Sequence, residues 1–309
     1  MSYAGPEFEP PQVRRLRRGP LTVALAALVP GALAGWAVYA AVGGGGADGP
    51  DRAQAGASHT NPSAASSAPS PGRPSPDDGK SSATPLAGKV IVIDPGHNPG
   101  NFRHTTEINR PVDIGTNRKE CDTTGTSTNA GYTEAEFTLD VAHRVRTLLE
   151  KQGATVKFTH DGNSPAWGPC VDQRARIGNT AHADAAVSIH ADGATEGDRG
   201  FHVILPGPVH SGAADTRPIV GPSRDLGTRI VGRFLRDTGE PPSNYLGKGT
   251  GLVTRTDLGG LNLSTVPKVF IECGNMRDSK DAALLTSGTW RQRAARGISE
   301  GIVSFLRRS

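Results

Sequence analysis

The sequence has no charged residue between Gly19 and Ala47, although charged residues make up 21% of the 309-residue chain. Most of this stretch, residues 21–42, is apolar and is long enough to cross a bilayer as a helix. Four arginines precede it within residues 14–18, and such a cluster favours a cytoplasmic N-terminus. We therefore predict a basic cytoplasmic segment over residues 1–20, a transmembrane helix or signal anchor over 21–42, and export of the remainder.

Two other interpretations of residues 21–42 remain open. Small residues at 37–41 fit the cleavage site of a signal peptide, in which case the exported part would be secreted. A buried core helix is the second alternative, but packable sequence does not follow it. The apolar run exceeds the usual core of a signal peptide, which favours a single-pass anchor in the cell membrane.

Bulky apolar residues are nearly absent from residues 43–86, which consist largely of Gly, Ala, Ser and Pro. Such a composition cannot bury enough surface to offset the entropy lost on ordering, and no folded repeat interrupts it. We therefore predict a disordered linker. The remaining residues, 87–309, are enough for one α/β domain with a full core.

Aromatic residues are also few, at 5% of the chain, and no stretch combines a basic stripe with interleaved aromatics. Nucleic acid is therefore not an expected partner. The net charge of +4 is mild. It could favour an anionic cell envelope, but a charge of this size more often serves solubility.

Cysteine is scarce, with three in the chain. Cys121 and Cys170 lie in loop-like surroundings rich in Gly, Thr and Pro, whereas Cys273 lies within an apolar run. In an exported domain this distribution favours a Cys121–Cys170 disulfide and a buried free thiol at Cys273. Three reduced cysteines are the alternative.

Short β-branched apolar runs alternate with amphipathic segments through residues 87–309. The expected strands are 89–93, 155–159, 185–189, 200–205 and 266–271, and the expected helices lie within 133–153, 171–182, 226–235 and 298–306. The expected loops are 98–131, 206–222 and 239–251. This alternation predicts a single α/β domain whose mostly parallel, twisted sheet carries helices on both faces.

Polar residues follow three of the predicted strands. His97 comes after the first strand by way of a Pro-Gly turn, while His190 and Glu272 directly end two others. Ligands collect at the carboxyl ends of strands in open parallel sheets. Glu134 opens the helix that follows the first long loop. Two imidazoles and a carboxylate with an open fourth position are expected of a catalytic zinc, and a further carboxylate can act as general base.

Taken singly, two of these residues have ordinary explanations. His97 could cap a loop carbonyl, and Glu134 could interact with the dipole of its helix. Glu272 is harder to explain, because a carboxylate within an apolar strand is costly unless it is paired or near a metal. Tyr245 could stack on a sugar or peptide, but surface packing explains it equally well. We assign no role to the other domain histidines, His104, His143, His160, His182, His202 and His210.

The segments around these residues resemble the zinc-dependent N-acetylmuramoyl-L-alanine amidases, the peptidoglycan hydrolases typified by cell-separation and germination amidases. The resemblance extends over essentially all of residues 87–309 and looks most like actinobacterial members in the Cys121 loop. Its motifs are Val92-Ile-Asp-Pro-Gly-His97, Glu134 with Leu139 and Gly153, Ser188-Ile-His-Ala191 with Arg174 and Asn179 before it, and Glu272-Cys-Gly274.

The resemblance implies hydrolysis of the amide between the lactyl group of N-acetylmuramic acid and L-alanine, in peptidoglycan or in muropeptide fragments. His97, Glu134 and His190 would hold one Zn²⁺ that activates water and polarises the amide carbonyl. Glu272 would carry the proton from the water to the leaving amine. Weaker candidates for supporting or substrate contacts are Asp94, Arg174, Asn179 and Asp192. The catalytic domain is expected to be a monomer, tethered to the membrane by the N-terminal helix.

Two positions depart from the family pattern. Asp192 stands where the family commonly has Asn, and Asn275 stands where it usually has Phe. Neither is an expected metal ligand, so the departures concern substrate contacts. Two other functions remain open: a different zinc hydrolase of envelope polymers, such as a peptidase or deacetylase, and a non-catalytic peptidoglycan-sensing regulator on the same fold. A regulator would be expected to have lost a ligand or the glutamate, and this chain retains all four.

Overall fold

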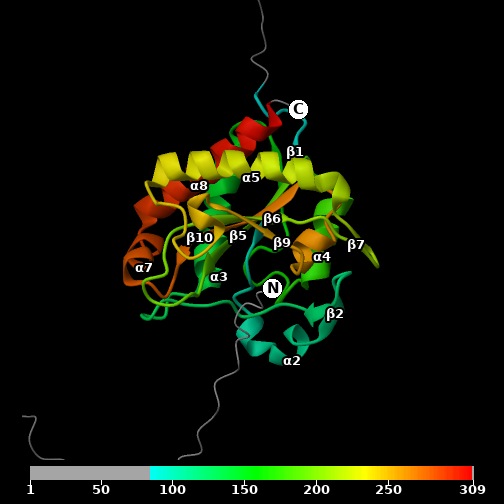
Figure 1. The fold of residues 1–309 in the computed structure, drawn as a ribbon, viewed down its shortest axis with the longest axis horizontal. Helices are drawn as coiled ribbons and strands as arrows, with labels where there is room; N and C mark the ends of the chain where they lie inside the picture. The colour runs from blue at the N-terminus through cyan, green and yellow to red at the C-terminus, as the bar shows by residue number, and fades with distance from the viewer. Residues whose placement is uncertain (1–83, 308–309) are drawn as a thin grey trace, which may run out of the picture. The chain divides into compact units, whose positions relative to one another are not determined.

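The computed structural model describes residues 84–307 (Figure 1). The predicted segments 1–20 and 21–42 and nearly all of the predicted linker lie outside the described residues. Within residues 84–307, no helix has both the length and the apolar character needed to cross a membrane. Leu86, which we placed in the linker, is fully buried, and its amide donates to the carbonyl of Gln152. The folded domain therefore begins before residue 87.

A six-stranded sheet of order β4-β1-β5-β10-β6-β9 forms the centre of the domain. Neighbouring strands run parallel except β10 and β6, which are antiparallel, so the prediction of a mostly parallel sheet is confirmed. The strands are β1 (Val90–Pro95), β4 (Thr155–Phe158), β5 (Ala185–Asp192), β6 (His202–Pro206), β9 (Leu252–Arg255) and β10 (Lys268–Asn275). The sequence did not reveal β9, because this edge strand is only partly buried and carries no long apolar run.

Helices cover both faces of the sheet, as predicted (Figure 1). One face carries α3 (Glu134–Glu150), α5 (Arg217–Thr238) and α8 (Gly288–Leu306), which bury the larger core. The other face carries α4 (Val171–Thr180) and the short α6 (Gly259–Asn262). A further helix, α7 (Ser279–Leu285), packs against β10 and α8.

Alternation along the strands decides which face each side chain occupies. In β1, Ile91 and Ile93 belong to the larger core under α3, whereas Val92 belongs to the smaller core on the α4 side. Asp94 therefore faces the α4 side as well. The same alternation places Ser188 and His190 of β5 on that side, since Val187 and Ile189 belong to the larger core.

All three of the predicted loops contain regular structure. Residues 98–131 include η1 (Asn101–Arg103), α2 (Thr105–Ile108) and a hairpin of β2 (Pro111–Asp113) and β3 (Arg118–Glu120). Residues 206–222 include β7 (His210–Ser211), β8 (Ala214–Asp215) and the start of α5. Within the predicted loop 239–251 lies η2 (Gly247–Gly249).

The prediction of loop for the first residues of α5 is wrong. Pro218 lies in the first turn, where proline is tolerated because the amide would be unpaired there in any case. Pro222 lies inside the helix. The buried positions Ile219, Ser223 and Leu226 continue the helical spacing past it, so packing of this face against the core overrides the local preference of proline.

The predicted disulfide is confirmed, and Cys273 is free and buried. Cys121 and Cys170 lie 49 residues apart in sequence. The bridge attaches the end of the β2–β3 segment to the start of α4, and the amide of Val171 also donates to the carbonyl of Cys121. It thereby fixes the residues that follow Cys121, two of which support the site described below.

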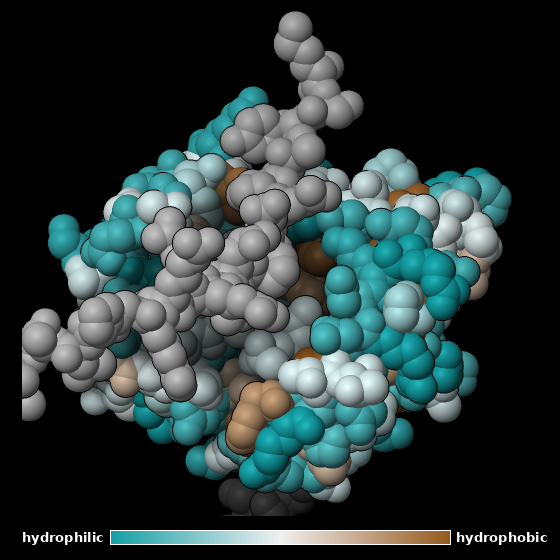
Figure 2. Space-filling model, turned by 90° about the horizontal axis from the view of Figure 1, so that it is seen from below, coloured by the Kyte–Doolittle hydropathy of each residue, from teal (hydrophilic) through white to brown (hydrophobic). Residues whose placement is uncertain are grey.

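Figure 2 shows the side of the domain that carries α2. Over the coloured part of this face, hydrophobic residues form separate spots in a mostly hydrophilic surface. The large hydrophobic side chains that are exposed within residues 84–307 are Phe102, Leu235 and Leu246, which come from three different segments. The described surface therefore offers mainly polar contacts.

Candidate active site

The three predicted ligands, His97, Glu134 and His190, come together at the carboxyl ends of β1 and β5. One donor atom from each lies within 4.8 Å of the other two. His97 Nε2 is 3.0 Å from Glu134 Oε2, and His190 Nδ1 is 3.0 Å from Glu134 Oε1. The two imidazole rings are almost perpendicular, with centroids 5.0 Å apart. Two imidazole nitrogens and one carboxylate that converge in this way are a donor set that fits a single Zn²⁺.

Two glycines allow the ligands to approach one another. A Cβ atom on Gly96 would lie 2.4 Å from the ring of His190, so any side chain there would displace that ligand. A Cβ atom on Gly125 would lie 2.7 Å from His97 and 2.9 Å from the carboxylate of Glu134. The Pro-Gly turn before His97 was evident in the sequence, but the role of Gly125 was not, because it lies in a long loop.

A capping box at the start of α3 explains which of two nearby glutamates enters the site. The side chain of Thr133 accepts from the amide of Glu136, and the Glu136 carboxylate accepts from the amide of Thr133. Glu136 is thus used at the helix end. Glu134 is buried and accepts from the amides of Thr126 and Ala191, at 3.0 and 3.2 Å.

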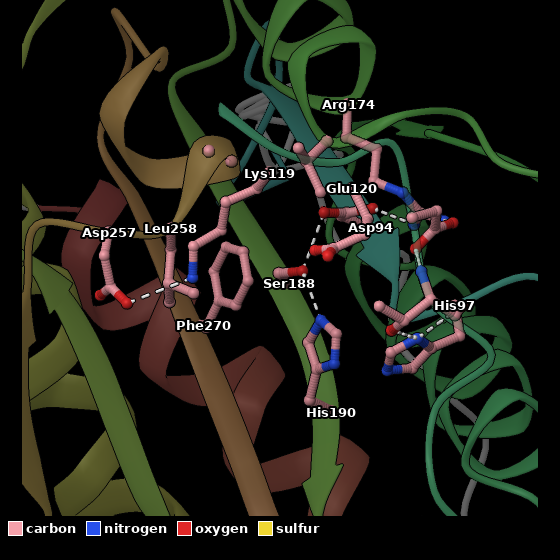
Figure 3. Close-up of a pocket in the computed structure, with 15 residues that line it drawn as sticks. Asp94, His97, Lys119, Glu120, Arg174, Ser188, His190, Asp257, Leu258 and Phe270 are labelled. Atoms are coloured by element: carbon pink, nitrogen blue, oxygen red, sulfur yellow. Dashed lines mark hydrogen bonds and ion pairs between the residues drawn. The ribbon is translucent and has the colours of Figure 1, made fainter. Parts of the chain in front are cut away.

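Each histidine nitrogen that faces away from Glu134 has its own partner. His97 Nδ1 lies 3.1 Å from the carbonyl of Thr123, to which it can donate. His190 Nε2 lies 3.2 Å from Ser188 Oγ, and Ser188 in turn donates to Asp94 Oδ2 at 2.8 Å (Figure 3). In the neutral form of each ring, donation to these acceptors leaves His97 Nε2 and His190 Nδ1 free to bind a metal.

Asp94 and Arg174 lie behind the ligands in a buried polar network. Asp94 accepts from Thr159 at 2.6 Å, from Arg174 at 2.8 Å and from Lys268 at 3.3 Å. Arg174 also donates to Asp122 at 2.7 Å. Burial alone would raise the pKa of Asp94, but Lys268 and Arg174 hold it well below its ordinary value. The carboxylate therefore stays ionised beneath Ser188.

Asn179 does not reach the site. Its amide donates to the carbonyl of Leu263 at 2.8 Å, and its oxygen accepts from the amide of Thr265. Arg174 and Asn179 are separated by about 7.5 Å along the axis of α4, so only the first turn of this helix lies under the ligands. The expectation that Asn179 contacts the site is corrected accordingly.

The two departures from the family pattern have structural partners. Asp192, at the end of β5, accepts from the hydroxyl of Tyr245 at 2.8 Å and from the amide of Gly193 at 2.7 Å. Asn275, at the end of β10, donates to the carbonyls of Thr195 and Asp198. Tyr245 is therefore tied to Asp192, and Asn275 holds the loop after β5.

Glu272 lies one strand away from the ligand His190. In the sheet register it is directly opposite His190 of β5 on one side and His202 of β6 on the other. Its Oε2 is buried and has no hydrogen-bond partner among the described residues. Burial raises the pKa of Glu272 well above its ordinary value, and the carboxylates of Asp192 and Glu134 add to this effect. Raised carboxyl pKa values are typical of groups that both accept and deliver protons.

His202 is a residue of this site that the sequence did not indicate. It is 2% exposed, and its ring meets the ring of Tyr245 edge-on at 5.9 Å. Burial lowers the pKa of His202 to about 4, so the imidazole is neutral at pH 7. No ligand-like spacing marks it, and only the antiparallel pairing of β6 with β10 brings it to Glu272.

A cavity of about 250 Å³ lies beside the histidines, on the α4 side of the sheet (Figure 3). Phe270 forms part of its wall and stacks on His190, with ring planes 3° apart and centroids 5.2 Å apart. Lys119 of β3 reaches toward Asp257, with Nζ 3.4 Å from Oδ2. The cavity can therefore receive a small part of a substrate next to the metal ligands, bordered by one aromatic and one ion-paired side.

Comparison with known proteins places this site in a family. Residues 91–304 match the N-acetylmuramoyl-L-alanine amidase family, and the chain belongs to it. It is 41% identical to N-acetylmuramoyl-L-alanine amidase Rv3717 of Mycobacterium tuberculosis over 228 aligned residues. The alignment covers 73% of this chain and 90% of the relative.

Solved structures agree with this assignment. The crystal structure of the N-acetylmuramyl-L-alanine amidase Ami1 from Mycobacterium smegmatis superposes with a TM-score of 0.66 at 40% identity, over 72% of this chain and 99% of that one. The crystal structure of apo Ami1 from Mycobacterium abscessus superposes with a TM-score of 0.65 at 38% identity, over 72% of this chain and 100% of that one. The protein is thus an N-acetylmuramoyl-L-alanine amidase that acts on peptidoglycan, and the resemblance noted in its sequence is confirmed.

The pKa of His97 makes the affinity of the site for Zn²⁺ depend on pH. Burial alone would lower the pKa of His97, but the carboxylate of Glu134 raises it to about 9 in the metal-free protein. Below that pH a proton occupies the imidazole and must leave before a metal binds. We expect the affinity for Zn²⁺ to fall roughly tenfold per pH unit between pH 9 and 7, with about one proton released from His97 at pH 7.

Competition with a chelator of known pH dependence would measure the affinity. Calorimetry in two buffers of different ionisation enthalpy would count the protons. An affinity that does not change between pH 7 and 9 would show that His97 is not a protonated ligand of the free site.

Proposed function

We propose that the protein cleaves the amide bond between the lactyl group of N-acetylmuramic acid and L-alanine with one Zn²⁺ and a glutamate base. Family membership supports the reaction. The mechanism rests on the convergence of His97, Glu134 and His190 one strand away from Glu272. Peptidoglycan and its muropeptide fragments both contain this bond.

The surroundings of each residue at the site indicate its role in the reaction. Zinc at this cluster would supply a Lewis acid that polarises the amide carbonyl and activates a water. Glu134 contributes the negative charge of the ligand set. Thr123 and Ser188 keep the two imidazoles in the tautomers that expose His97 Nε2 and His190 Nδ1 to the metal.

Glu272 acts as general base and then as general acid. It takes a proton from the attacking water and delivers it to the nitrogen of L-alanine as the amide bond breaks. Its raised pKa suits delivery of the proton. The charge of a nearby divalent cation favours the ionised form that accepts it.

The other functions left open by the sequence have less support. A non-catalytic regulator has no need of a complete ligand set with a spare buried carboxylate beside it. A peptidase or deacetylase could use the same residues, but the match of residues 91–304 is to amidases.

Substitution of the two glutamates should separate base from ligand. Glu272→Gln keeps the shape but cannot accept a proton, so we expect full zinc content and a loss of roughly two to four orders of magnitude in kcat. Glu134→Gln removes the negative ligand, so we expect weaker zinc binding and partial rescue by added metal. Zinc analysis and initial rates of stem-peptide release from muropeptides would test both.

Two results would contradict these roles. Loss of zinc in Glu272→Gln with full zinc in Glu134→Gln would mean that the roles are exchanged. Undiminished activity of Glu272→Gln would mean that another group is the base.

We also propose that residues 21–42 anchor the protein in the cell membrane and that the linker holds the catalytic domain outside the cytoplasm. The Cys121–Cys170 disulfide supports an oxidising location for the catalytic domain. A peptidoglycan substrate also lies outside the cytoplasm. The uncharged apolar run after the arginine cluster supports the anchor.

A reporter that is active only outside the cytoplasm should therefore be active when it is fused after Ser309, and a reporter that requires the cytoplasm should be inactive there. The protein should also fractionate with membranes at its full mass. Strong activity from a reporter that requires the cytoplasm would refute the orientation. A mature protein that begins after residue 42 would show a cleaved signal peptide in place of the anchor.

A further inference from the structure

Three polar residues form a row across neighbouring strands at the edge of the site: His190 on β5, Glu272 on β10 and His202 on β6. Directly opposed residues in paired strands point to the same face, and in an antiparallel pair such as β10 and β6 their Cβ atoms are about 4.5–5.5 Å apart. The first residue of the row is a ligand and the second is the base in the proposed mechanism. The third has no role in it.

The surroundings of His202 are unusual for a structural residue. Its neighbours Val203, Ile204 and Leu205 are buried and apolar, and His202 itself is 2% exposed. Its Nδ1 is buried without a hydrogen-bond partner among the described residues. An apolar side chain would fill this position in the strand without leaving a polar atom unpaired. The position therefore carries an imidazole for a reason other than packing.

The unpaired atom on the adjacent strand indicates that reason. Oε2 of Glu272 is also buried without a partner in the described chain. A neutral imidazole offers one N–H to donate, and an ionised carboxylate can only accept, so the two groups are complementary. Buried polar atoms are almost always paired, either directly or through an ordered water.

We propose that His202 is a positioning residue for the base: its Nδ1–H holds Oε2 of Glu272 through one bridging water, and so directs Oε1 toward the metal ligands. Tyr245 supports this arrangement. Its ring packs edge-on against His202, and its hydroxyl is fixed by Asp192. The inference rests on the proposed role of Glu272 as general base.

The test compares three variants of the full chain: His202→Asn, His202→Gln and His202→Phe. Asparagine places its amide nitrogen near the position of Nδ1, whereas glutamine, which is also a polar amide, places it near Nε2. We expect His202→Asn to keep kcat within about threefold of the unmodified protein. His202→Gln and His202→Phe should lose about 10- to 100-fold in kcat with little change in KM, because a misaligned base slows the reaction without weakening binding.

Each substitution is repeated in the Glu272→Gln background, with zinc content and thermal unfolding measured throughout. If His202 acts through Glu272, His202→Gln should cause no further loss of kcat once the base is gone. A merely structural role would lower kcat by the same factor in both backgrounds.

Several outcomes would overturn the inference. These are an unchanged kcat in His202→Phe, equal activities of His202→Asn and His202→Gln, equal losses in both backgrounds, or a raised KM with unchanged kcat, which would indicate a substrate contact. If His202→Phe does not fold, the asparagine and glutamine pair still decides. Failure of the proposed function is a different result: Glu272→Gln would then be as active as the unmodified protein.

Discussion

The buried ion pair of Asp94 and Arg174 is the interaction on which the geometry of the site depends. From Asp94, a hydrogen bond leads through Ser188 to His190. From Arg174, an ion pair leads to Asp122, and the next residue, Thr123, contacts His97. Loss of one partner of a buried pair typically destabilises a protein by about 3–5 kcal/mol. The ion pair between Asp94 of β1 and Arg174 of α4 thus supports both imidazoles. The disulfide at Cys121 also fixes the segment with Asp122 and Thr123.

The register of the sheet determines which side chains of the site lie next to one another. Side chains alternate between faces, so His190 and Glu272 project on the α4 side, away from the larger core that stabilises the fold. Parallel pairing of β5 with β10 sets His190 beside Glu272, and antiparallel pairing of β10 with β6 adds His202. Burial then raises the pKa of Glu272, the proposed base, and keeps the imidazole of the neighbouring His202 neutral.

The part of the site that lies at strand ends could be predicted from the sequence, because apolar runs that end in His190 or Glu272 are local patterns. The disulfide was also predictable, from the loop-like surroundings of Cys121 and Cys170, whereas the ligand role of Glu134 followed from the family resemblance and not from its place at a helix start. His202 and Gly125 were not, because their roles arise from contacts between distant segments. Asn179 was misplaced for the same reason, since a match to a motif does not reveal where the side chain of a helix residue finds its partners.

The chemistry of the site depends most on the composition of the metal centre, which the X-ray absorption spectrum of the zinc-loaded protein measures directly. We predict a first shell of two imidazole nitrogens with oxygen as the only other ligand type, at about 2.0–2.2 Å. A zinc–sulfur distance of about 2.3 Å, which would bring in Cys273, or a third imidazole in the shell, which would make His202 a ligand, would contradict the assignment of His97, Glu134 and His190 as the protein ligands.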